Sequence, residues 1–490
     1  MNRSVNTQRG KQRQGNLPRG VGSMAFTELW ERFSFYGLQG ILSFYLLYSL
    51  ADGGLEVDPA SASGIVGAYG GAVYLAQLLG AWLGDRLISP KYMVLHGALI
   101  ITAGHIALAI TAGLAGLAIG LILIVLGTGA LKTNITSIVG FVVEDNPEEK
   151  RDVSFSYFYM AINAGAVLGP LSTGWVQNEH GFHWGFGLAA IGMAAALIVY
   201  IASMHKLPSK ASIVNNPLNR SKYLTVMVVA VIAVAIVIAL FASGALLPKD
   251  LSTATTVLSL IAAGAYFATM GLSSQVSPPE KRRVFAFFPL FLVSGIYFGL
   301  LFQKFTAISV LIKERVDLSI GDWSFPVAWI TTVSPLSAVL ITPVIAALWN
   351  KLGPKQPSPP AKFAIGMIQI GCAYLFMLAI ASMTGDAFIP LALILLFMML
   401  AGSSEVFVGP IGLALATKIG PKNFQAQMVG LNFLTLALGS SLSGLLGQLF
   451  TTIPSEQYFI IIASTGICLG ALILIFQKPL TSNLYQGIDR

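Results

Sequence analysis

The chain has 490 residues, of which 55% are hydrophobic and only 10% are charged, and its mean hydropathy is +0.76. Because a soluble domain carries about 25% charged residues, this composition excludes an ordinary soluble protein and places most of the chain in a lipid bilayer. The formal net charge of +8 does not indicate a nucleic acid partner, because the basic residues fall in alternate loops between apolar segments.

Fourteen apolar segments follow one another along the chain, each long enough for the roughly 20 residues that a membrane span requires. They are 24–50, 62–88, 92–113, 115–140, 153–176, 184–204, 221–244, 252–272, 285–312, 324–349, 362–384, 387–416, 423–451 and 456–477. This repetition excludes a protein with a single membrane anchor and predicts an all-α membrane protein with fourteen transmembrane helices.

Loops with clustered Lys and Arg alternate with loops that are short or acidic, which is the pattern of the positive-inside rule. We therefore expect both termini in the cytoplasm and the protein in the inner membrane of the cell. The polar N-terminal tail lacks the apolar core and cleavage site of a signal peptide, so we expect the first span to insert uncleaved.

The fourteen segments divide into two sets of six with a pair between them. We predict a cytoplasmic tail (1–20), an N-terminal six-helix bundle (21–205), linkers with an inserted transmembrane hairpin (206–284), a C-terminal six-helix bundle (285–478) and a second cytoplasmic tail (479–490). The inserted pair, 221–272, is rich in Val, Ala and Ile, and we expect it to face lipid outside any binding site.

Three charges lie inside the first apolar segment, at Glu28, Glu31 and Arg32, and their spacing places them on one face of a helix. Lys132 is a further cation inside the fourth segment. Each charge at the centre of a span costs about 2.5–3.5 kcal/mol, so these groups must face a common polar cavity. A static ion-pair network is the alternative interpretation, but burying ion pairs is a poor way to add stability.

The histidines and cysteines give no sign of catalysis or metal binding. The five histidines are scattered outside any HExxH arrangement, so we expect no metal, no cofactor and no enzymatic activity. Cys372 and Cys468 lie in apolar segments without a partner motif, and we expect both to be buried free thiols.

The first-span charges form a longer pattern, Glu28-Leu-Trp-Glu31-Arg32-Phe33, which resembles the ExxERF signature of the proton-coupled oligopeptide transporters, a major-facilitator family. Four further stretches resemble motifs of the same family, and together they extend the likeness from about residue 20 to residue 477. They are Gly80 to Arg86, Gly127 to Lys132, Phe158 to Gly165, and Gly402 to Leu413.

The resemblance implies a major-facilitator fold with the substrate held at mid-membrane between the bundles. It implies a symporter that imports di- and tripeptides by alternating access, with the proton as coupling ion. Glu28 and Glu31 would couple protons, Arg32 and Lys132 would bind the substrate carboxylate, and Glu405 would bind its ammonium group. The other residues at family pocket positions are Tyr36, Gln39, Tyr74, Asn163, Phe298, Gln303, Ser334 and Asn432, and Asp85 with Arg86 would form a gate.

Several positions depart from the family pattern. Many family members have an arginine at the position of Gln39 and an acidic residue at the position of Phe302. A gate formed by that arginine and that acidic residue would lack both partners in this chain. Ser334, Gly409 and Asn432 also differ from the usual residues, and Lys304 is an additional cation without a counterpart. These departures bear on the substrate range more than on the transport mechanism.

Other functions remain open at this level. A transporter of another small zwitterion or anion, such as an amino-acid-like compound or nitrate, would use the same fold. A peptide sensor that does not transport would also keep these residues. Glu405 favours a ligand with an amine over a simple anion, and we expect the protein to act as a monomer.

Overall fold

The computed structural model describes residues 18–144 and 146–487, and these are almost entirely helical. The basic residues predicted for the N-terminal tail before residue 18 lie outside the described residues. The helices are α1 (Val21–Leu47), α2 (Pro59–Arg86), α3 (Pro90–Ile110), α4 (Gly113–Val143), α5 (Glu148–His180), α6 (Phe182–Ser203), α7 (Tyr223–Ala242), α8 (Leu251–Leu272), α9 (Pro278–Leu301), α10 (Ala307–Arg315), α11 (Val327–Leu352), α12 (Pro359–Thr384), α13 (Leu391–Ser403), α14 (Gly409–Ile419), α15 (Gln425–Phe450) and α16 (Ser455–Leu484). Strands β1 (Ser319–Ile320) and β2 (Trp323–Ser324) form an antiparallel hairpin between α10 and α11.

The predicted fourteen spans are confirmed. Twelve helical segments of the described chain are long and apolar enough to cross a bilayer, and two of them are the interrupted pairs α9–α10 and α13–α14. Helices α1 and α5 supply the other two spans. Helix α1 misses the apolar criterion because it carries Glu28, Glu31 and Arg32. Helix α5 misses it because Asn163 and several Ser, Tyr and Gly residues lower its hydropathy beyond the charged first turns.

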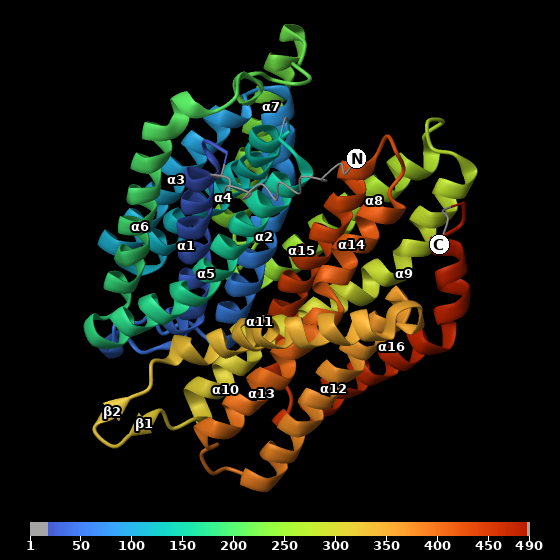
Figure 1. Cartoon of the computed structure of the whole chain (residues 1–490). Coiled ribbons are helices and arrows are strands. Elements are labelled where there is room, and N and C mark those ends of the chain that lie inside the picture. The colour runs from blue at the N-terminus through green and yellow to red at the C-terminus, as the bar shows by residue number, and fades with distance from the viewer. Residues whose placement is uncertain (1–17, 145, 488–490) are drawn as a thin grey trace, which may run out of the picture.

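The helices gather into two bundles, α1–α6 and α9–α16, which meet at the end of the molecule that carries β1 and β2 and diverge toward the end with the start of α1 and the end of α16 (Figure 1). At the closed end, the indole Nε1 of Trp329 on α11 donates to the carbonyl of Leu171 on α5 at 2.8 Å. Ser440 on α15 donates to the carbonyl of Gly67 on α2 at 3.2 Å. The hydrogen bonds between the bundles therefore hold one end of the molecule and leave the other open.

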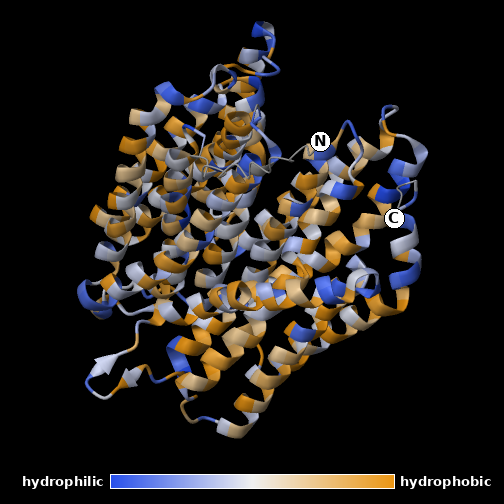
Figure 2. Ribbon diagram, in the orientation of Figure 1, coloured by the Kyte–Doolittle hydropathy of each residue, from blue (hydrophilic) through white to orange (hydrophobic). Residues whose placement is uncertain are grey.

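The inserted pair differs from our expectation, because only one of its helices lies wholly outside. No residue of α7 is buried, and its apolar surface fits a lipid environment (Figure 2). Helix α8, by contrast, buries a stripe of small polar residues against α2 and α15. Ser252 donates to the carbonyl of Gly64 at 2.8 Å, and Gly67 allows α2 close to Gly444 of α15 beside the same serine. The prediction of a lipid-facing hairpin is thus wrong for α8, which joins the seam between the bundles.

The two cysteines also differ from expectation. Cys372 on α12 and Cys468 on α16 are free but exposed, not buried. Each side chain lies on a helix face directed away from the bundle, and such a face is covered by lipid rather than protein. Apolar neighbours in the sequence do not distinguish a side chain buried in protein from one exposed to lipid.

The packing of α8 against α2 and α15 gives a testable contrast between the two inserted helices. Ser252→Leu removes the hydrogen bond to Gly64 and forces a larger side chain between closely packed helices. Overpacking of this kind costs about 1–3 kcal/mol. We expect the midpoint of thermal unfolding of the purified protein in detergent to fall by a few degrees.

The matched control is Ala230→Leu on α7, whose side chain is exposed. This variant should unfold at the wild-type temperature. Equal effects of the two substitutions would contradict a structural role for the α8 seam.

Candidate functional site

Two helix breaks bring polar residues to the middle of the molecule. Helix α9 ends at Leu301 and is followed by a 3₁₀ turn, Phe302–Phe305, that carries Lys304. Helix α13 ends at Ser403 and leads into a second 3₁₀ turn, Ser404–Phe407, that carries Glu405. Irregular backbone is tolerated at membrane depth where it lines a cavity or is buried in protein, so both breaks suit the wall of a site.

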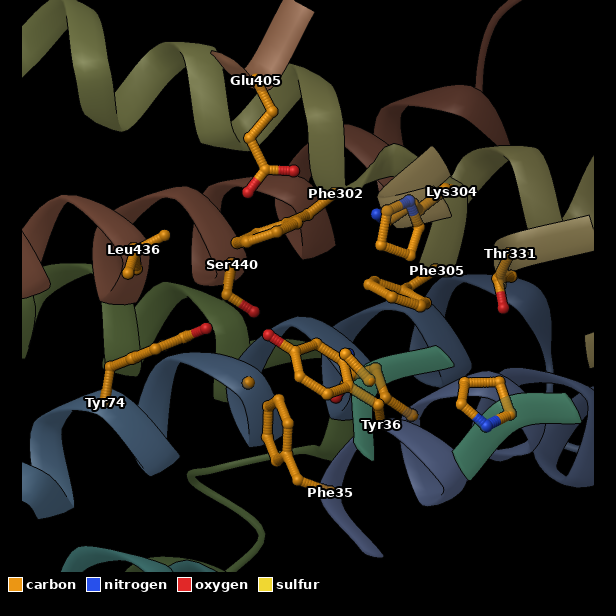
Figure 3. A pocket seen from close by; sticks show the side chains of 15 residues that line it. Phe35, Tyr36, Tyr74, Phe302, Lys304, Phe305, Thr331, Glu405, Leu436 and Ser440 are labelled. Atoms are coloured by element: carbon orange, nitrogen blue, oxygen red, sulfur yellow. The ribbon is translucent and has the colours of Figure 1, made fainter. Parts of the chain in front are cut away.

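A cavity of about 160 Å³ lies between the bundles beside these breaks. A second cavity of about 260 Å³ adjoins it, and the two share Tyr36, Ala166, Pro335 and Glu405. Figure 3 shows Glu405 and Lys304 approaching the first cavity from the C-terminal bundle, opposite Tyr36 and Tyr74 of the N-terminal bundle. Both bundles therefore contribute polar groups to the two adjoining cavities between them.

The four charges of the N-terminal bundle are paired with one another. The Arg32 guanidinium donates to both oxygens of Glu31, with Nε–Oε2 at 2.5 Å and Nη2–Oε1 at 2.6 Å. Lys132 Nζ donates to Glu28 Oε1, which also lies 3.7 Å from Arg32 Nε. The side chains of both glutamates are fully buried. The predicted cluster is thus one connected network.

These cations do not line either cavity in this structure. The Arg32 guanidinium instead lies over the ring of Phe35, at 5.1 Å from its centroid, and Phe35 and Tyr36 separate it from the cavity. Arg32 and Lys132 are consequently neutralised by the two carboxylates, and Arg32 is also screened by the rings of Phe35 and Tyr36. A change in the charge of either carboxylate would alter what the cations can bind.

Five of the predicted binding residues reach the cavities. Tyr36, Gln39, Tyr74 and Glu405 line the first cavity, and Asn163 lines the second. The amide nitrogen of Asn163 donates to the carbonyl of Tyr159 one turn earlier on α5 at 2.9 Å.

Four other predicted binding residues lie outside the lining of both cavities. Phe298 packs against Gly439 of α15, and Asn432 lies beside Gly412 of α14. Gln303 is fully engaged within the C-terminal bundle, where its Oε1 accepts from Thr306 at 3.1 Å and Tyr458 at 2.8 Å. Ser334 is buried behind Lys304. Helical periodicity alone did not reveal which way these side chains point.

The predicted gate residues contact a connector rather than the opposite bundle. The Asn216 amide donates to both carboxylate oxygens of Asp85, at 3.2 and 3.1 Å. The backbone amide of Leu218 donates to the carbonyl of Arg86 at 2.9 Å. In this open arrangement, Asp85 and Arg86 fix the connector between α6 and α7 to the end of α2.

Lys304 is the cavity residue to which sequence analysis gave no role. Its Nζ donates to Ser334 Oγ at 3.0 Å, and it lies 5.1 Å from the centroid of the Phe305 ring. The neighbouring Phe302, Phe305 and Thr331 also line the cavity. The sequence did contain a signal for Lys304, because a cation inside a membrane span is costly unless it faces a polar cavity.

Comparison with known proteins identifies relatives over nearly the whole chain. The family model described as the POT family matches residues 91–463. The chain is 36% identical over 96% of its length to the uncharacterized transporter YclF of Bacillus subtilis (strain 168), of which it covers 96%. It is 33% identical over 94% of its length to a di-/tripeptide transporter of Lactococcus lactis subsp. cremoris, of which it covers 96%.

Two solved structures agree with the fold. A peptide transporter POT in complex with sulfate shares 34% identity and a TM-score of 0.89, over 96% of each chain. A POT family transporter in complex with 5-aminolevulinic acid shares 32% identity and a TM-score of 0.89, over 95% of this chain and 97% of that one.

The ion pair between Glu28 and Lys132 predicts how substitutions at these two residues change the stability of the protein. Lys132→Gln leaves the Glu28 carboxylate buried with a weaker partner, and breaking a buried pair in this way costs about 3–5 kcal/mol. We expect a lower unfolding midpoint at neutral pH, measured on purified protein in detergent. The loss should shrink at lower pH, where Glu28 can take up a proton instead.

The double variant Glu28→Gln/Lys132→Gln serves as the control, since it removes both charges and leaves two neutral amides. It should recover most of the lost stability. A double variant as unstable as the sum of the two single variants would show that the pair is not energetically coupled.

Proposed function

This chain belongs to the POT family, and we propose that it is a proton-coupled symporter that imports di- and tripeptides across the cell's inner membrane. The relatives named above support the substrate class, since one is a di-/tripeptide transporter. The cavity supports it as well, because Glu405 and the Arg32–Lys132 network lie on opposite bundles. A short peptide carries opposite charges at its two ends and matches this arrangement.

The open end of the molecule faces the cytoplasm in our proposal. It carries the start of α1 and the end of α16, together with the basic loops between α6 and α7 and between α8 and α9 (Figure 1). Positive charge in short loops favours the cytoplasmic side. The structure then corresponds to an inward-facing state, with the β1–β2 end closed toward the outside.

The decisive observation is that the two first-span carboxylates are bonded to the two cations of the N-terminal bundle. Protonation of Glu28 and Glu31 would therefore release Lys132 and Arg32 in the same event. The released cations would bind the peptide carboxylate, and Glu405 would bind its ammonium group. Loss of the protons on the cytoplasmic side would restore the ion pairs and expel the peptide.

Recognition of the peptide backbone would fall to Tyr36, Tyr74 and Asn163, which line the cavities. Hydroxyl and amide groups hydrogen-bond amides without reading side chains, so they suit a transporter of varied peptides. The membrane potential supplies about 2.3 kcal/mol per 100 mV for each charge moved inward. One proton per peptide would support substantial accumulation.

A second candidate is a transporter of an amino-acid-like zwitterion. One solved relative holds 5-aminolevulinic acid, and the first cavity is small at about 160 Å³. Competition among dipeptides, free amino acids and nitrate against one labelled substrate separates these classes. Binding of dipeptides without any flux would indicate a sensor.

Proton coupling is tested by uptake of labelled Ala-Ala into proteoliposomes. We expect wild-type protein to accumulate the dipeptide when the interior is alkaline, because the gradient drives protonation from outside. Glu28→Gln should abolish this accumulation while permitting exchange between internal and external dipeptide, since only the proton step is removed.

The matched control is Glu456→Gln, which removes an exposed carboxylate at the start of α16. It should accumulate Ala-Ala as the wild type does. Accumulation by Glu28→Gln at the wild-type level would falsify the coupling role.

The role of Glu405 is tested by removing charge from the substrate. Wild-type protein should bind Ala-Ala more tightly than N-acetyl-Ala-Ala, because only the free amine carries a charge for Glu405. Hydrogen bonds to charged groups are worth about 1.5–3 kcal/mol, so this preference should be about tenfold or more. In Glu405→Gln the preference should largely disappear.

Both peptides are measured by competition on the same preparation, so differences in protein amount cancel. An unchanged preference in Glu405→Gln would place the ammonium elsewhere.

A further inference from the structure

Lys304 differs from Arg32 and Lys132 in how it is satisfied. Only 7% of the residue is exposed, and its Nζ donates to the neutral hydroxyl of Ser334. No carboxylate lies within 4 Å of it among residues 18–144 and 146–487. Arg32 and Lys132, by comparison, each contact a glutamate. A buried ammonium group with only a neutral protein partner is poorly compensated, so its place on a cavity wall indicates use by a ligand.

Gln39 gives an independent sign at the same place. Only 4% of this residue is exposed, and it lines the same cavity from the N-terminal bundle. Its amide oxygen is buried without a hydrogen-bond partner, and its amide nitrogen makes no hydrogen bond within the described chain. A buried amide without a partner loses about 1–3 kcal/mol, so it too is prepared for a ligand or water. Gln39 and Lys304 are also two of the positions at which this chain departs from the family pattern.

Glu405 is not the resident partner of Lys304. Both side chains line the first cavity from the C-terminal bundle, with Phe302 beside them (Figure 3), yet they form no ion pair in the described residues. A static counter-ion would be in contact with the ammonium group. Separate opposite charges in one cavity instead allow a ligand to satisfy both at once.

We propose that Lys304 and Gln39 form a subsite for a carboxylate of the substrate, in addition to the one assigned to Arg32 and Lys132. This inference rests on the proposed function and specifies its substrate class: peptides with an acidic side chain. The Lys304 ammonium would donate to the carboxylate, and the Gln39 amide nitrogen, which makes no hydrogen bond among the described residues, would donate a second bond. A terminal carboxylate has the same chemistry, and the experiment distinguishes the two sources.

The test compares isosteric peptides that differ in one charge. Inhibition of labelled Ala-Ala binding is measured with Ala-Glu, Ala-Gln and Ala-Gln amide on purified wild-type protein and on Lys304→Gln. We expect the wild type to prefer Ala-Glu over Ala-Gln, and Lys304→Gln to reduce that ratio about tenfold, as for loss of a charge-assisted hydrogen bond. Each ratio is taken within one variant, so a change in overall affinity cancels.

Charge reversal gives a second variant with the opposite outcome. Lys304→Glu should favour Ala-Lys over Ala-Gln, because the subsite then carries a negative charge. Lys362→Gln is the matched control, since Lys362 is equally buried but lies away from the cavity and donates to Gln356. Its ratios should equal those of the wild type.

The outcomes separate the possibilities. A change confined to the Ala-Glu to Ala-Gln ratio supports a side-chain subsite, and a change confined to the Ala-Gln to Ala-Gln amide ratio supports a subsite for the terminal carboxylate. Both ratios unchanged in Lys304→Gln would overturn the subsite. If wild-type protein binds no dipeptide at all, the proposed function fails, whereas binding without uptake leaves the subsite testable.

Discussion

The constraint on which this structure depends is that charge inside a bilayer must be paired or face a cavity. Glu28 and Glu31 on α1 meet Lys132 on α4 and Arg32 on their own helix, and the resulting network is buried behind Phe35. Such a network adds little stability compared with apolar packing. In the proposed cycle its value is that protonation of Glu28 and Glu31 changes the partners of both cations.

The way the two bundles touch decides how that change can be used. Hydrogen bonds between the bundles lie toward one end, as between Trp329 and Leu171, and α8 joins the seam there through Ser252. The other end is open (Figure 1). Interrupted helices place Glu405 and Lys304 between these ends, at the point where rocking of the bundles would expose them in turn.

The two halves of the cavity are not equivalent. The N-terminal bundle offers cations that are already neutralised, whereas the C-terminal bundle offers Glu405 and Lys304 without ion-pair partners among the described residues. A ligand entering from the open end thus meets C-terminal charges that form no ion-pair contact among the described residues, with Lys304 bonded to Ser334. In the proposed function, the charges of Glu405 and Lys304 would then recognise the substrate from one bundle, while the proton-coupling carboxylates lie on the other.

The sequence by itself determined the spans, the family and the charged network, because hydropathy and the cost of membrane charge are properties of short segments. Only the tertiary structure decided which face of each helix meets a neighbour, the cavity or lipid. It turned Gln303 into the C-terminal bundle and Cys372 outward, packed α8 into the seam, and brought Lys304 to the cavity beside Glu405. Those orientations depend on contacts between residues hundreds of positions apart, which no local pattern contains.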